Sequence, residues 1–345
     1  MTAAAEAIRP VGAARAGGGW ALAWRRLRRD PFALVSGSFI AFVLFMVFAG
    51  GPVVSLVVGH GPNTIFIYGA DNLKPVPPWT WVPATTATVE STAHVPKTLL
   101  ILGSDGALGR DELLRLLYGG RVSLEVALGA TALAVLIGAT LGSLAAYFGG
   151  LVDAVISRFT DLVIAFPLLL FLIMLGSTSA GDTLDNITFG HVLNRGVFAL
   201  VVLIGGLTWF YPARIVRAQI LSLREREFVQ AATMIGASDS RILRKHLAPH
   251  LAPALASYGM IAVATNLLLE AGVSFLGTGI RLPTASWGTM LGQTFGSVAN
   301  PTPYNASTFS LWPTVIPSLA IFLTVLALNH FGESLRDALD PRFVR

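Results

Sequence analysis

The 345-residue sequence contains no cysteine, which excludes disulfide bonds, thiolate metal sites and cysteine nucleophiles. Charge is also scarce. Only 12% of the residues are charged, whereas 54% are hydrophobic and the mean hydropathy is +0.67. A soluble globular chain carries about 25% charged residues. The composition therefore excludes an ordinary water-soluble protein and indicates a chain whose core lies in lipid.

Motifs for ATP hydrolysis and metal binding are missing as well. A P-loop needs a lysine directly after a glycine, and none of the three lysines follows one. There is no HExxH motif, and Pro249 is expected to break the helix that would align His246 with His250. We predict no catalytic, cofactor or metal site in this chain. The pI near 9.9 requires no nucleic acid, because arginines facing an anionic membrane surface give the same balance.

Six apolar stretches meet or approach the length of about 20 residues that a helix needs to cross a hydrocarbon layer. They are residues 32–58, 122–148, 154–176, 197–218, 254–277 and 312–332. The sequence therefore predicts an all-α membrane protein with six transmembrane helices. Pro167 is expected to kink the third span, and Tyr211–Pro212 should bend the fourth.

The distribution of Lys and Arg predicts the orientation of these spans. With a cytoplasmic N-terminus, seventeen of the 24 basic residues lie inside, and the remaining seven lie outside: Lys74, Lys97, Arg110, Arg115, Arg121, Arg195 and Arg281. Cytoplasmic loops carry the excess of basic residues in membrane proteins. We therefore predict that both termini are cytoplasmic.

The spans divide the chain into segments. We expect a cytoplasmic N-terminal tail (1–31), a first transmembrane helix (32–58), an extracytoplasmic segment (59–120), a five-helix core (121–333) and a cytoplasmic C-terminal tail (334–345). The core contains a cytoplasmic loop (223–250) and an outer loop (278–311). Leucines at 113, 114, 116 and 117 beside charged residues suit either a short amphipathic helix on the membrane surface or a plain connector.

The charged loop 223–250 has helical periodicity. Four residues recur at i, i+3, i+4 and i+7 on one face of a short helix: Phe228, Ala231, Ala232 and Ile235. Gly236 offers a break, Ser238 can cap a second helix, and Pro249 is expected to end it. Two short helices with small alanines would fit a groove on a soluble partner. An ordinary solvated loop is the alternative.

A few ionisable groups lie inside the apolar runs. Glu270 sits well within the fifth span, so it should face protein or water rather than lipid, and Asn266 is one turn away on the same face. Arg158 and Asp161 at the cytoplasmic end of the third span are expected to pair locally. Glu270 could serve a proton-coupled secondary transporter, or it could fix helix packing. A membrane receptor subunit that docks a signalling protein through the loop is a third reading.

The segment FVQAATMIGASDSRILRKHLAP resembles the cytoplasmic EAA loop of ABC importer permeases. Four further segments resemble the C-type subunit of dipeptide and oligopeptide permeases, in the order of that family: RRLRRDPFALVSG, LGSDGALGRDELLRLLYGGRVSL, LLLEAGVSFLGTGIRLPTASWGTM and GESLRDALDPR. The resemblance covers nearly the whole chain. It departs at Gln230, where many members carry glutamate, and in SDGALGRD, which is one residue longer between Asp105 and Gly109.

The resemblance implies a type I ABC importer permease fold in a bacterial inner membrane. It implies a homologous second permease subunit, ATPase subunits that bind ATP and Mg, and an extracytoplasmic protein that delivers a peptide. Related permeases carry dipeptides, longer peptides, glutathione-like peptides or nickel chelates. The implied ATPase-coupling residues are Phe228, Gln230, Ala231, Ala232, Gly236, Ala237, Ser238, His246 and Pro249, and the polar or pathway residues inside the membrane are Glu270, Asn266, Asp161, Arg158 and Pro167.

Overall fold

The computed structural model describes residues 18–71, 74–85, 95–105, 108–176, 196–299 and 311–339. In these ranges four helices are long and apolar enough to cross a membrane, and two bent helix pairs raise the number to six if each pair is one span. The prediction of an all-α membrane protein is confirmed. Residues 1–17 of the predicted N-terminal tail, 300–310 of the outer loop and 340–345 of the C-terminal tail lie outside the described residues.

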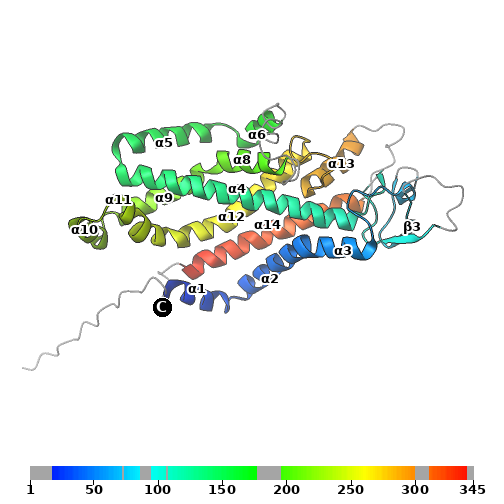
Figure 1. Ribbon diagram of the computed structural model, residues 1–345, viewed down its shortest axis with the longest axis horizontal. Coiled ribbons are helices and arrows are strands. Elements are labelled where there is room, and N and C mark those ends of the chain that lie inside the picture. Colours follow the sequence, from blue (N-terminus) through cyan, green and yellow to red (C-terminus); the bar gives the residue numbers. More distant parts are fainter. Residues whose placement is uncertain are drawn as a thin grey trace, which may run out of the picture.

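The helices run along the long axis of the molecule, and short strands gather at one end (Figure 1). In chain order, the described α-helices are α1 (Gly18–Leu27), α2 (Pro31–Phe45), α3 (Gly51–Val58), α4 (Glu112–Phe148), α5 (Gly150–Ala165), α6 (Leu168–Gly176), α8 (Val197–Thr208), α9 (Phe210–Leu223), α10 (Glu227–Met234), α11 (Asp239–Arg241), α12 (Ala248–Phe275), α13 (Trp287–Ala299) and α14 (Leu311–Leu339). Two π-helical segments, Met46–Gly50 and Ile242–Leu247, join α2 to α3 and α11 to α12.

The strands form two small antiparallel hairpins. β1 (Ala70–Asp71) pairs with β2 (Lys74–Pro75), and β3 (Thr80–Pro83) pairs with β4 (Lys97–Leu100) with Thr80 opposite Leu100. Phe66, Val76, Val82 and Leu100 form a separate small core under them. This strand region lies at the end of the bundle opposite α10 and α11 (Figure 1).

Helix α4 is central to the bundle, because it packs against α8, α9 and α12. Asp111 begins the helix by accepting hydrogen bonds from the backbone amides of Leu113 and Leu114, a common N-cap arrangement. The leucines that suggested a separate surface helix therefore belong to the first turns of α4. Neither of the two alternatives, a separate surface helix or a plain connector, is found, and Leu114 and Leu117 are buried within the protein.

Two spans are broken at prolines. Helix α5 ends at Ala165 and α6 continues at an angle of 80°, so Pro167 does more than kink the third span. Helices α8 and α9 meet at 41° around Trp209. This bend precedes Pro212, as expected from the clash of a proline ring with the carbonyl group four residues earlier.

Pro249 does not end a helix, and this prediction was wrong. Helical structure continues from Asp239 to Phe275, with Pro249 in the first turn of α12. The preceding π-helical segment Ile242–Leu247 has a wider turn. Proline is tolerated at the start of a helix, where its missing N–H would have no partner within the helix.

A small-residue contact sets the distance between α4 and α9. A methyl group at Gly142 would overlap the carbonyl oxygen of Ala213 on α9, whereas a methyl group at Gly259 on α12 would meet open space. We predict that Gly142→Ala lowers stability by about 1–3 kcal/mol through overpacking, and that Gly259→Ala leaves it unchanged or slightly higher. The measurement is the thermal unfolding midpoint of both variants in the same detergent. Equal midpoints for the two variants would contradict this packing.

Candidate coupling surface and intramembrane polar sites

Loop 223–250 contains the helix break expected at Gly236. Gly236 has φ +80°, and the backbone amides of Gly236 and Ala237 donate to the carbonyl groups of Thr233 and Ala232. This is how a helix commonly ends at a left-handed glycine. Ser238 occupies the N-cap position of α11, but its side chain makes no capping hydrogen bond. The turn therefore depends on the glycine conformation rather than on the serine hydroxyl.

The predicted single face of α10 is divided in the structure. Val229 and Ala232 are buried against α9 and the start of the next helix, in a cluster that also includes Ala237. Ala231 is exposed, and Met234 and Ile235 are each 86% exposed. Val229 and Ala232 form the face of α10 that turns to the bundle, and the predicted helix face did not include Val229. Ile235 follows the last residue of α10 and is exposed. Ala232 consequently packs inside the loop and is not a contact surface.

Phe228 and His250 hold the two sides of the loop together. Their rings stack with centroids 5.3 Å apart and an interplanar angle of 15°. His250 Nδ1 lies 2.9 Å from the carbonyl oxygen of His246, while Gln230 is exposed and donates to the carbonyl group of Glu225. Among the described residues, no group of three or more His, Cys, Asp or Glu side chains is arranged to hold a metal ion.

The loop is also tied to the end of α4. The hydroxyl of Tyr147 donates to Asp239 Oδ1 at 2.7 Å, and Arg224 Nη1 donates to the carbonyl oxygen of Ala146 at 3.0 Å. The second bond satisfies one of the last carbonyl groups of α4, which lack a partner within the helix. Both contacts fix the position of the loop relative to the end of α4.

Ion pairs connect α5 to α9. Asp161 pairs with Arg214 at 2.6 Å rather than with Arg158, which is exposed, so the prediction of a local pair was wrong. Asp153 accepts two hydrogen bonds from Arg217, at 2.5 and 2.7 Å. The local sequence gave no sign of these partners, which are 53 and 64 residues apart.

Glu270 and Asn266 both face α4 from α12. Glu270 is fully buried, and its Oε1 accepts a hydrogen bond from Ser274 Oγ at 2.7 Å. Within the part of the chain that the structure describes, Oε2 makes no hydrogen bond, although Ser123 and Ser286 lie near the same carboxyl group. Asn266 donates to Thr131 Oγ1 at 2.9 Å. Glu270 thus lies at a buried point where α12, α4 and the segment before α13 meet.

An ionic cluster at the strand end was missed by sequence reasoning. Asp105 pairs with Arg110 and with the fully buried Arg115, at 2.5 and 2.9 Å. Gln293 Oε1 accepts a hydrogen bond from each arginine, at 2.9 and 3.1 Å. The cluster fixes α13 and the outer segment to the start of α4. Two members of the cluster, Asp105 and Arg110, belong to the motif SDGALGRD. Gln293 lies in the segment 278–311, which was predicted to be an outer loop.

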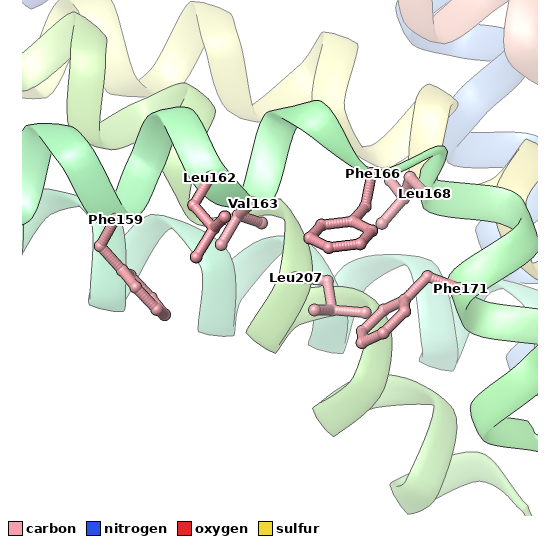
Figure 2. A pocket seen from close by; sticks show the side chains of 7 residues that line it. All are labelled: Phe159, Leu162, Val163, Phe166, Leu168, Phe171 and Leu207. Atoms are coloured by element: carbon pink, nitrogen blue, oxygen red, sulfur yellow. The ribbon is translucent and has the colours of Figure 1, made fainter.

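A cavity of about 200 Å³ lies at the break between α5 and α6. Figure 2 shows the seven side chains that line it, and all are apolar: Phe159, Leu162, Val163, Phe166, Leu168, Phe171 and Leu207. Pro167, predicted to lie on a pathway, forms the break itself. The cavity offers only apolar contact.

Two family models match the chain. Residues 138–345 match the model described as binding-protein-dependent transport system inner membrane component. Residues 19–75 match the N-terminal TM domain of oligopeptide transport permease C.

Three relatives support the same assignment. A peptide permease protein of Brucella ovis is 38% identical over 70% of this chain and 72% of its own length. The dipeptide transport system permease protein of Bacillus subtilis is 32% identical over 94% and 86%, and the glutathione transport system permease protein of Pectobacterium atrosepticum is 30% identical over 94% and 91%. The chain therefore belongs to the binding-protein-dependent transport system inner membrane components, and within them to the C-type permeases of ABC peptide importers.

Proposed function

We propose that this chain is the non-catalytic membrane subunit of an ATP-driven importer of dipeptides or oligopeptides, and that loop 223–250 receives the ATPase subunits. The observation that carries the docking site is the exposed apolar tip of the loop, Met234 and Ile235, on an otherwise charged segment. Exposed apolar patches rimmed by polar residues mark protein interaction sites. ATP and Mg belong to the ATPase subunits in this proposal, and this chain binds no cofactor.

The remaining partners follow from the family. A homologous second permease subunit completes the pathway, and an extracytoplasmic binding protein delivers the substrate. The relatives named for peptide, dipeptide and glutathione transport support a short peptide as substrate. Glutathione-like peptides or nickel chelates are the alternative substrates for the same type of permease.

Movement would pass from the loop along continuous helices. Helical structure from Asp239 to Phe275 spans 37 residues, or about 55 Å at 1.5 Å per residue. It runs from the second half of the loop to Glu270 and beyond, while Tyr147 and Arg224 connect the loop to α4. Closure of the ATPase subunits would therefore tilt α4 and α12 together. Rearrangement of helices, without bond chemistry, is the proposed mechanism.

The coupling proposal predicts the effect of charge at the loop tip. Ile235→Asp combined with Met234→Asp should weaken co-purification of the ATPase subunits by at least about tenfold, because carboxylates would be buried in an apolar contact, and should abolish ATP-driven uptake. Ile235→Leu is the matched control and should retain both. Reconstituted complexes and quantified co-purification provide the measurement. Wild-type binding and uptake by the double aspartate variant would rule out this docking site.

The proposed topology places both termini and loop 223–250 in the cytoplasm. Helix α1, the end of α14 and α10 lie at one end of the molecule, and β3 lies at the other (Figure 1). Because the chain has no cysteine, single cysteines report on this directly. A cysteine replacing the exposed Lys97 should react with a membrane-impermeant maleimide in intact cells, and one replacing the exposed Ser240 should react only after lysis. The reverse pattern would invert the orientation.

We assign Glu270 to helix packing rather than to proton transport. Glu270→Gln retains an acceptor for Ser274, so we expect normal uptake and a nearly unchanged unfolding midpoint. Glu270→Leu leaves the hydroxyl of Ser274 without its acceptor, which costs about 1–3 kcal/mol, so its midpoint should fall. Uptake and thermal unfolding of both variants distinguish the roles. If Glu270→Gln abolished uptake with an unchanged midpoint, the carboxyl group would have a transport role.

A further inference from the structure

Helix α1 is firmly held against the end of α14. Ala23 and Leu27 are buried with Ala33 and Ala338. Arg26 Nη1 donates to the carbonyl oxygen of Ala338 at 3.1 Å, which satisfies one of the last carbonyl groups of α14. Helix α1 therefore has a fixed position in the structure.

The turn after α1 adds a second connection to α14. Asp30 begins α2 by accepting a hydrogen bond from the backbone amide of Phe32 at 3.0 Å. The hydroxyl of Ser334 donates to the other carboxylate oxygen of Asp30 at 2.7 Å, which lowers the pKa of this carboxyl group. The carboxylate is thus engaged within the protein.

The other side of α1 and its following turn is basic and exposed. Arg25, Arg28 and Arg29 are exposed, and Trp24 is 55% exposed. The guanidinium group of Arg28 lies 4.8 Å from the centre of the Trp24 ring, a cation–π arrangement. None of these side chains takes part in the contacts with α14 described above.

The basic surface borders the lipid-facing part of α2. Only Asp30 and Pro31 separate Arg29 from Phe32, which is 73% exposed, and Val35 is 72% exposed. Helix α2 belongs to the first span, so its exposed apolar side chains lie at the depth where the hydrocarbon layer begins. Trp24 and the three arginines are therefore at the level of the phospholipid headgroups, where tryptophan and arginine are enriched.

We propose that Trp24, Arg25, Arg28 and Arg29 form a binding surface for the headgroups of anionic phospholipids. Guanidinium groups bind phosphate oxygens through paired hydrogen bonds, and juxtamembrane clusters of basic residues attract anionic lipid. The exposed Arg336 on α14 adds positive charge. Glu333 and Asp337 are also exposed on α14, and the four arginines between residues 25 and 29 outnumber these two carboxylates.

The test measures lipid binding to the full-length chain purified in detergent with its partner subunits. Fluorescent phosphatidylglycerol is the probe, and fluorescent phosphatidylcholine is the neutral comparison. Each arginine near a membrane surface contributes roughly a fivefold gain in affinity. The triple variant Arg25→Gln, Arg28→Gln, Arg29→Gln should therefore bind phosphatidylglycerol on the order of a hundredfold more weakly at low salt, with unchanged phosphatidylcholine binding.

Two matched variants separate the lipid surface from general charge and from misfolding. The variant Lys97→Gln, Arg281→Gln removes two exposed basic residues outside this surface and outside loop 223–250, and it should bind phosphatidylglycerol like the wild type. The variant with lysine at positions 25, 28 and 29 keeps the charge and should retain most of the binding. Equal affinity of the glutamine triple variant and the wild type would overturn the proposal.

Two further outcomes would also overturn it. Binding of soluble glycerol phosphate as tight as the binding of phosphatidylglycerol would identify a site for soluble phosphate. Loss of the ATPase subunits from the glutamine triple variant with unchanged lipid binding would identify a protein interface. The lipid proposal is independent of the transported substrate, so failure of the peptide assignment leaves it standing.

Discussion

The close backbone contact between α4 and α9 is the constraint on which the arrangement of the other helices depends. Gly138 and Gly142 on α4 face the backbone around Trp209 and Ala213 on α9, with no room for a methyl group at either glycine. Helices in lipid gain little from a hydrophobic effect between them, so close packing of small residues is a main source of association. This contact fixes where α9 ends, and α9 leads directly into the loop with α10. The position of the proposed docking surface therefore depends on two glycines of α4.

Three prolines have three different effects, and their surroundings explain why. Pro167 interrupts the third span completely, Pro212 follows a moderate bend, and Pro249 sits in a continuous helix. A proline inside a helix removes one backbone hydrogen bond, whereas a proline in the first turn does not. In lipid, a freed carbonyl group needs protein or water around it. The break at Pro167 therefore requires protein or water around the carbonyl groups that it frees, and the apolar cavity lies at this break.

The long apolar spans and the glycine break at Gly236 could be predicted because each depends on local sequence. Run length alone decides whether a helix can cross lipid, and a left-handed turn strongly favours glycine. The ion pairs of Asp161 and Asp153 could not be predicted, because their partners come from another helix. The same holds for Ala232: periodicity placed it on a face, but only the packing of Val229 against α9 shows that this face turns inward.

Helix α1 illustrates how distant contacts give structure to a segment with a weak local signal. Its first residues, Gly18 and Gly19, are glycines, which are poor helix formers, and an isolated helix of ten residues is marginal in water. Its packing against α14, about 310 residues away, supplies the missing stability through buried Ala23 and Leu27 and the bond from Arg26. Once Arg26 and Asp30 are engaged within the protein, the remaining arginines are left on the outer side. The contacts with α14 therefore hold Arg25, Arg28 and Arg29 in a fixed orientation next to the start of the first span.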